Sequence, residues 1–128
     1  MRLIFALLAV TTLLTSPARA EMNLVMVEEQ GCMWCARWNE EIWPIYPKTT
    51  EGARAPLRRI EMTDPIPADL TFDRPPHYTP TFILVNDGFE VARIEGYPGE
   101  DFFWGLLDMM IKQSDMIKQS DAAKAAEG

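Results

Sequence analysis

The spacing of the only two cysteines, Cys32 and Cys35, constrains this chain more than any other feature of its sequence. The apolar, β-branched stretch from Asn23 to Glu28 precedes them and predicts a buried strand. After them, apolar residues recur at helical spacing as far as Ile45, and Pro44, which lacks an N–H, is expected to kink or end the helix within a turn. This helical stripe consists of Trp34, Cys35, Trp38, Ile42 and Ile45. The pair is therefore predicted to open a helix directly after a strand.

This position suits the two cysteines for thiol–disulfide exchange. Unpaired N–H groups and the positive end of the helix dipole stabilise a thiolate, so they lower the pKa of a cysteine in the first turn. Cys32 is the expected nucleophile, and Cys35, about one turn later on the apolar stripe, is the expected resolving thiol. A bridge between them closes too short a loop to add much stability.

Two other interpretations of the pair stay open, a metal site and an inert structural bridge. Structural zinc needs about four ligands, and His77 is the only histidine that could join the cysteines. A metal-binding or delivery module would bind copper or zinc stoichiometrically, whereas a non-catalytic interaction domain would bind its partner without either thiol. We expect no metal and no organic cofactor.

The first twenty residues are typical of a secretory signal peptide. Arg2 gives a positive start, the run from Leu3 to Leu14 is apolar, and Ala18-Arg19-Ala20 offers small residues for cleavage. This run is shorter than the roughly 20 residues that a membrane-spanning helix needs. We therefore expect cleavage after Ala20 and export to the periplasm; an uncleaved anchor is the alternative.

The remaining 108 residues suit a single domain with a strongly acidic surface. All 19 acidic residues lie in this part, and ten of the 12 lysines and arginines, which gives a formal charge of −9. Nucleic acid and anionic lipid are unsuitable partners, because both require positive charge to neutralise phosphate. We expect a monomeric protein that binds other proteins.

Sequence patterns predict the other elements. Leu57 to Met62 is expected to be a second strand, and residues 48–56 and 63–78 irregular chain. Thr81 to Val85 and Phe89 to Glu95 are expected to form a hairpin around Asn86-Asp87-Gly88. An amphipathic helix should run from Glu100 to about Lys112. The predicted domain is residues 21–112, followed by a frayed polar tail, residues 113–128.

With these elements in place, the chain resembles the thioredoxin superfamily. The resemblance rests on the cysteine pair after its strand, on Thr79-Pro80-Thr81 before TFILVNDG, and on the final helix. It implies a compact α/β fold of glutaredoxin size, with a mixed central sheet flanked by helices. It also implies a cis Thr79–Pro80 bond before the hairpin, and a Thr79 backbone that pairs with an extended segment of the partner.

The chain departs from typical thioredoxins at two places. Met33 and Trp34 stand where Gly-Pro is usual, and we expect both to contact the partner protein. Met26 stands where a buried aspartate usually relays a proton to the resolving thiol. Glu28 is a candidate replacement, and the alternative is an ordinary surface acid at the strand end.

More narrowly, three stretches are similar to the SoxS type, the periplasmic thioredoxins of bacterial sulfur-oxidation systems. The stretches are GCMWCARWNEEI, PPHYTPTF and EGYPGEDFFW. This resemblance implies reduction of a disulfide or persulfide on a sulfur carrier like SoxYZ, with electrons from a membrane thiol transporter of the CcdA or DsbD type. An oxidising or isomerising disulfide-bond protein is the alternative, since the motif supports either direction.

Overall fold

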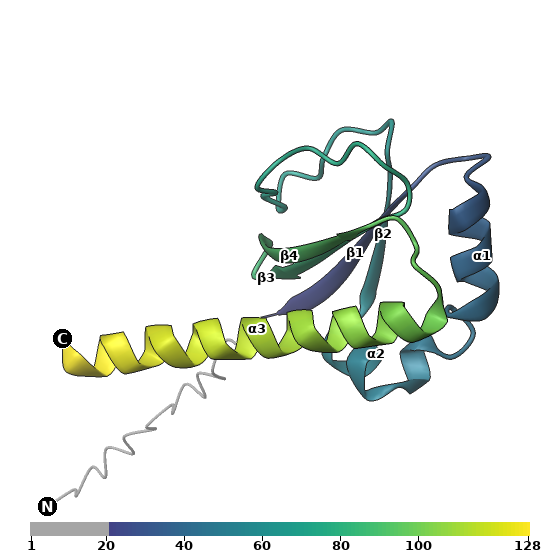
Figure 1. The fold of residues 1–128 in the computed structure, drawn as a ribbon. Helices are drawn as coiled ribbons and strands as arrows, with labels where there is room; N and C mark the ends of the chain where they lie inside the picture. The colour runs from purple at the N-terminus through teal and green to yellow at the C-terminus, as the bar shows by residue number, and fades with distance from the viewer. Residues whose placement is uncertain (1–20) are drawn as a thin grey trace, which may run out of the picture.

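The computed structural model describes residues 21–128, so the predicted signal peptide and its cleavage site lie outside the described residues. Within this range the chain forms four strands and four helices, one of them a 3-10 helix (Figure 1). In chain order they are β1 (Met22–Glu28), α1 (Met33–Glu41), η1 (Tyr46–Lys48), α2 (Thr50–Arg54), β2 (Leu57–Glu61), β3 (Thr81–Asn86), β4 (Phe89–Glu95) and α3 (Glu100–Glu127). None of the helices described has the length and apolar character that a membrane span requires.

The strands form one mixed sheet in the order β2-β1-β3-β4. β1 pairs in parallel with β2 and antiparallel with β3, and β3 pairs antiparallel with β4. The parallel step needs a crossover, which α1, η1 and α2 supply between β1 and β2. The central strands β1 and β3 are buried almost throughout, as their apolar sequences predicted. The predicted mixed sheet of a thioredoxin-like fold is thus confirmed.

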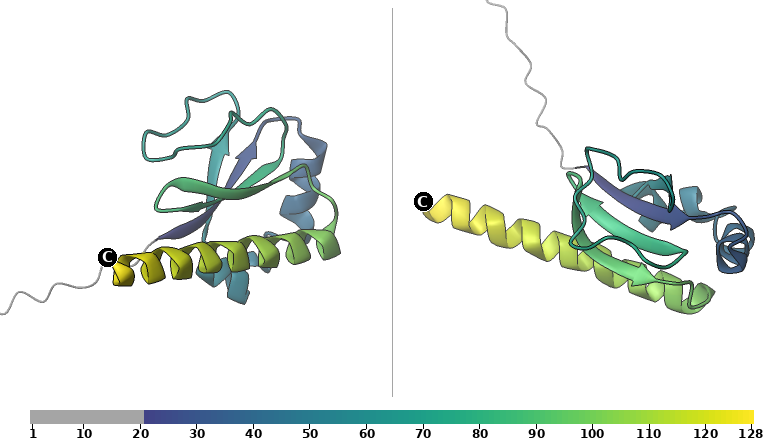
Figure 2. Two further views of the ribbon diagram at one scale, coloured as in Figure 1. Left: turned by 60° about the vertical axis from the view of Figure 1, so that its left-hand side comes forward. Right: turned by 90° about the horizontal axis from the view of Figure 1, so that it is seen from above.

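Side chains alternate between the two faces of the sheet, so each face has its own core. Leu24 and Met26 of β1, with Phe82 and Leu84 of β3, face a core that α1 and α3 complete. The intervening residues face the opposite core, where the irregular chain between β2 and β3 contributes Leu70 and partly buried neighbours. Figures 1 and 2 show this arrangement, with the helices gathered along one side and the long β2–β3 loop over the other.

An aromatic cluster fills the helical side of the sheet and fixes the direction of α1. Trp38 is fully buried, as predicted, and its ring centroid lies 5.3 Å from that of Phe82 and 5.7 Å from that of Phe103. Burying side chains of this size provides much of the stability of a small domain. Cys35 and Ile42 of the predicted stripe are buried as well, whereas Trp34 in the first turn of α1 and Ile45 beyond its end are exposed.

Two expectations about helices were wrong. Residues 48–56 are not simply a loop, because the Thr49 side chain accepts a hydrogen bond from Gly52 N–H and caps the short helix α2. The final helix does not end near Lys112, and α3 instead continues to Glu127 beyond the sheet (Figures 1 and 2). Residues 113–127 contain neither proline nor glycine, so nothing in their chemistry interrupts the helix.

Candidate active site

Cys32 lies at the junction between the turn that follows β1 and the first turn of α1. Gly31 has a φ of +79°, a conformation that glycine adopts without steric cost, and it directs the chain into the helix. Cys32 is the N-cap residue, and its sulfur accepts a hydrogen bond from Cys35 N–H at 3.1 Å. The predicted position of the pair, directly after a strand at the start of a helix, is therefore confirmed.

The two sulfurs form a disulfide and differ in exposure. Cys32 and Cys35 are bonded, with their Cα atoms 5.2 Å apart. Cys32 is half-buried, whereas only 4% of the Cys35 surface is exposed. A partner sulfur can therefore reach Cys32 from solvent, while Cys35 is shielded by α1 and the core. This asymmetry suits an attacking thiol followed by a resolving thiol.

The loop before β3 lies against the turn that precedes Cys32. The Thr79–Pro80 peptide bond is cis, and Pro80 is buried. The Thr79 hydroxyl donates to Glu29 Oε1 at 2.7 Å, and Gly96 N–H donates to the carbonyl of Pro80 at 2.7 Å. Thr79 is thus held against the turn that leads into Cys32, although 50 residues separate it from Glu29 in the sequence.

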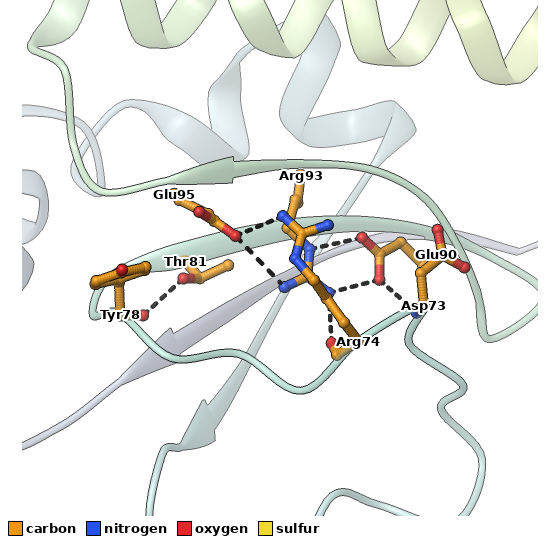
Figure 3. Close-up of polar contacts among 7 residues, drawn as sticks. All are labelled: Asp73, Arg74, Tyr78, Thr81, Glu90, Arg93 and Glu95. Carbon is orange, nitrogen blue, oxygen red and sulfur yellow. Dashed lines mark hydrogen bonds and ion pairs between the residues drawn. The ribbon is translucent and has the colours of Figure 1, made fainter.

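A buried ion pair on β4 holds the loop that leads to Thr79 (Figure 3). Glu90 and Arg93 pair at 2.6 Å, with 2% and 6% of their side chains exposed. Arg93 also donates to the carbonyl of Arg74, and Glu90 accepts from Asp73 N–H. Burial alone would raise the pKa of Glu90, but the hydrogen bonds from Arg93 and Asp73 outweigh it and lower that pKa. The pairing was not predicted from the sequence, where its only signal is two opposite charges within a predicted strand.

An open cavity of about 350 Å³ lies beside the disulfide. Glu28 lines it together with both cysteines, whereas Met33 and Trp34 do not. The complete lining is Glu28, Glu29, Gln30, Gly31, Cys32, Cys35, Ala36, Asn39 and Glu61. Carboxylates and the shielded sulfur thus share one solvent-accessible space.

Arg59 on β2 holds Glu28 at this cavity. It lies opposite Met26 in the parallel register of β1 and β2. Its guanidinium pairs with Glu28 Oε2 at 2.7 Å and donates to Asn39 Oδ1 at 2.6 Å. It also lies 4.9 Å from the centre of the Trp43 ring. Glu28 is therefore a paired side chain that borders the cavity from the last position of β1.

The chain was compared with known proteins. It is similar to a solved structure described as the periplasmic thioredoxin SoxS from Paracoccus pantotrophus in its reduced form, with 51% sequence identity and a TM-score of 0.72. The alignment covers 73% of this chain and 99% of that one. The chain belongs to the SoxS-type thioredoxins. No protein-family model and no curated protein sequence matches it.

Family membership confirms the resemblance predicted from the sequence and the class of reaction. A SoxS-type thioredoxin with a disulfide between Cys32 and Cys35 is a thiol–disulfide oxidoreductase. Among residues 21–128, no three histidine, cysteine, aspartate or glutamate side chains are grouped so that they could hold a metal ion. His77 lies exposed in the loop before Thr79, where it does not complete a ligand set with the cysteines.

The two residues between the cysteines of this SoxS-type thioredoxin are exposed. Met33 has 70% of its surface accessible and Trp34 has 46%. The Arg37 guanidinium carbon lies 5.6 Å from the centre of the Trp34 ring. Arg37 pairs with Glu41, which also accepts a hydrogen bond from the Tyr97 hydroxyl. These contacts were not predicted from the sequence, because Glu41 and Tyr97 are 56 residues apart.

Proposed function

We propose that this SoxS-type thioredoxin acts in the periplasm as a reductase of a dedicated protein partner. The observation that carries the proposal is the asymmetry of the disulfide, with Cys32 accessible at the helix N-cap and Cys35 shielded behind it. The relative from Paracoccus pantotrophus is described as periplasmic, which supports the same location. Removal of residues 1–20 after Ala20 would precede this work, and the mature protein would act as a monomer without metal or cofactor.

The proposed reaction moves two electrons from the protein to its partner. The Cys32 thiolate attacks one sulfur of the partner disulfide, the partner bond breaks, and its second sulfur leaves as a thiolate. Cys35 loses its proton and attacks Cys32 Sγ, which breaks the mixed disulfide and releases the reduced partner. The product is the Cys32–Cys35 disulfide. With a persulfide, Cys32 takes the outer sulfur, and the attack of Cys35 releases it as hydrosulfide.

The partner would bind across the exposed rim of the site. Thr79 supplies backbone groups beside the disulfide, and Pro80, which has no N–H, does not compete for them. Met33 and Trp34 offer adaptable apolar contact area next to Cys32. An extended partner segment that carries the target cysteine would then pair with Thr79 while its neighbouring side chains contact Trp34.

Glu28 would accept the proton of Cys35 during resolution. The buried aspartate of typical thioredoxins is absent, but Glu28 and Cys35 line the same cavity, which a water molecule could bridge. Arg59 pairs with Glu28 and keeps the carboxylate at the cavity. Proton acceptance from a shielded thiol through this cavity would be the role of Glu28.

The resemblance to the SoxS type names the expected partner and electron donor. The partner would be a sulfur carrier like SoxYZ, holding a disulfide or persulfide on a cysteine. A membrane thiol transporter of the CcdA or DsbD type would reduce the Cys32–Cys35 disulfide again after each turnover.

The redox equilibrium of the mature protein with glutathione or dithiothreitol tests the direction of the reaction. Alkylation of free thiols and tryptophan fluorescence would both report the fraction reduced. A potential near the roughly −270 mV of thioredoxin would support a reductase, whereas one near the roughly −120 mV of DsbA would overturn it in favour of an oxidant. Copper or zinc that binds stoichiometrically and protects both thiols would instead favour the metal-binding alternative.

A further inference from the structure

We propose that Tyr97 and Glu41 are positioning residues that set the orientation of the Trp34 ring for the protein partner. The inference deepens the proposed function and rests on it, because it assigns partner contact to Trp34. Trp34 is exposed and follows Cys32 by two residues in the sequence. Contacts through the side chains of Arg37, Glu41 and Tyr97 nevertheless connect its ring to the buried core.

The first link is between Trp34 and Arg37. These residues are three apart on α1, so they share one side of the helix. The guanidinium carbon of Arg37 lies 5.6 Å from the ring centre, within the range of a cation–π contact. Arg37 itself is long and exposed, and an arginine of that kind would not hold the ring in one place unless it were fixed by other groups.

The second link fixes Arg37 to a buried tyrosine. Glu41 uses one oxygen to accept from Arg37 Nε at 2.8 Å and the other to accept from the Tyr97 hydroxyl at 2.5 Å. The hydrogen bonds from Tyr97 and Arg37 lower the pKa of Glu41, so its carboxylate stays charged and attracts the guanidinium. Tyr97 is 7% exposed and packs edge-on against Phe103. The Arg37–Glu41 pair at the surface is therefore anchored by Tyr97, in the loop between β4 and α3.

This anchoring keeps the disulfide accessible. The ring lies over Arg37 along α1, and the cavity beside Cys32 and Cys35 is lined without Trp34. A partner can therefore approach Cys32 while one face of the ring offers apolar contact. If the ring were released, it would sample other rotamers and each partner would have to order it again on binding.

The decisive measurement is nuclear magnetic resonance of the tryptophan indole N–H groups in the oxidised full mature chain. Trp34→Phe assigns the Trp34 signal, and the buried Trp38 signal reports that the fold is intact. In Tyr97→Phe, which keeps the ring packing, and in Glu41→Gln, we expect the Trp34 signal to shift and its heteronuclear NOE to fall while Trp38 is unchanged. A Trp34 signal identical to wild type in both variants would overturn the proposal.

Kinetics with insulin as a protein disulfide test the consequence for the partner. We expect KM to rise about two- to fivefold, the factor equivalent to losing an exposed cation–π contact, with a smaller change in kcat. Glu40→Gln is the matched control, because Glu40 is exposed and lies about 100° around α1 from Glu41. A KM unchanged in Tyr97→Phe and Glu41→Gln, or raised equally in Glu40→Gln, would overturn the role in partner binding.

The two arms separate this inference from the proposed function. If the wild-type protein reduced no protein disulfide, this result would refute the proposed reductase activity and also the role of Tyr97 and Glu41 in partner binding. The resonance experiment needs no substrate. It would still decide whether Tyr97 and Glu41 orient Trp34.

Discussion

The backbone N–H of Cys35 donates a hydrogen bond to Sγ of Cys32 over 3.1 Å. The helix that carries the second cysteine thereby stabilises the first, since the same N–H and the helix dipole favour negative charge on that sulfur once the disulfide is reduced. The N–H of Cys32 donates a hydrogen bond to the carbonyl of Glu29 at 3.4 Å, which closes the turn between β1 and α1.

Replacing either cysteine with serine should separate the two steps of exchange. Cys32→Ser should abolish reduction of insulin, because the attacking sulfur is lost. Cys35→Ser should still attack but accumulate a mixed disulfide, which non-reducing electrophoresis and mass spectrometry detect. In this variant, iodoacetamide should alkylate Cys32 at pH values where an ordinary thiol, with a pKa near 8.5, is mostly protonated. A mixed disulfide that formed through Cys35 in Cys32→Ser would reverse the assignment of nucleophile and resolving thiol.

Glu28→Gln should slow the resolving step and leave the first attack largely intact. The expected loss is up to about 100-fold, the lower end of what general acid–base groups contribute. Rapid mixing with a disulfide substrate, followed by acid quenching, would measure the lifetime of the mixed disulfide. Glu61→Gln is the control, because Glu61 lines the same cavity. Equal slowing in both variants would assign the effect to general charge at the cavity and contradict a proton-accepting role for Glu28.

Breaking the buried pair on β4 should destabilise the fold and loosen the loop that leads to Thr79. Glu90→Gln leaves the Arg93 charge in a buried site, which should cost about 3 kcal/mol of unfolding free energy. Arg74→Gln is the matched control, because it removes an exposed pair with Glu95 and should cost at most about 1 kcal/mol. Urea denaturation would measure both values. Hydrogen exchange of residues 71–79 should rise in Glu90→Gln, and an unchanged exchange rate would contradict the anchoring role.

The same pair should make stability depend on pH in a defined direction. The folded-state pKa of Glu90 is lowered from its usual value of 4.5, because hydrogen bonds from Arg93 and Asp73 overcome the effect of burial. A depressed carboxyl pKa contributes stability above the unfolded pKa, and this contribution is lost as pH falls through the folded value. The difference in unfolding free energy between wild type and Glu90→Gln should therefore be constant near pH 7 and shrink below 4.5. A difference that grew on acidification would contradict this prediction.

The extended part of α3 should divide at about residue 117 into a portion that stabilises the fold and one that does not. Ser114 is buried and accepts from Asn86 at 3.3 Å, and Asp115 pairs with Arg54 at 2.6 Å. Ending the chain after Lys112 should therefore cost about 1–2 kcal/mol. Ending it after Ile117 removes mostly exposed residues and should change stability by less than about 0.5 kcal/mol. Thermal and urea unfolding of both truncated chains would measure these values, and equal stability would refute the division.

The continuous apolar character of two short segments was enough to predict the centre of the fold. Strands β1 and β3 are apolar at nearly every position, which requires both of their faces to be covered. The hairpin turn was also predictable, because Asp-Gly between two strand-like segments favours a tight turn. In the structure both Asp87 and Gly88 have the positive φ that such a turn requires. These features depend on neighbouring residues, whose backbone preferences and periodicity act over a few positions.

The parts of the site that are formed by neighbouring residues were predictable for the same reason. The cysteines, their strand and their helix are contiguous in the sequence. In contrast, Glu29 accepts a hydrogen bond from Thr79, which is 50 residues away, and Glu41 accepts one from Tyr97, which is 56 residues away. No periodicity connects such residues, because the partner of a polar side chain depends on the path of the chain through the whole domain.

The features of residues 21–128 thus fall into two groups, those set by local backbone chemistry and those set by contacts between distant segments. By itself the sequence determined where strands and the first helix begin, and which sulfur stands at a helix N-cap, since these follow from local backbone chemistry. Tertiary structure decided that Glu90 and Arg93 are buried as a pair, that Glu28 meets Arg59 at the cavity, and that α3 stays helical past Lys112. Burial and charge pairing are set by segments packed against one another, so only the assembled fold specifies them.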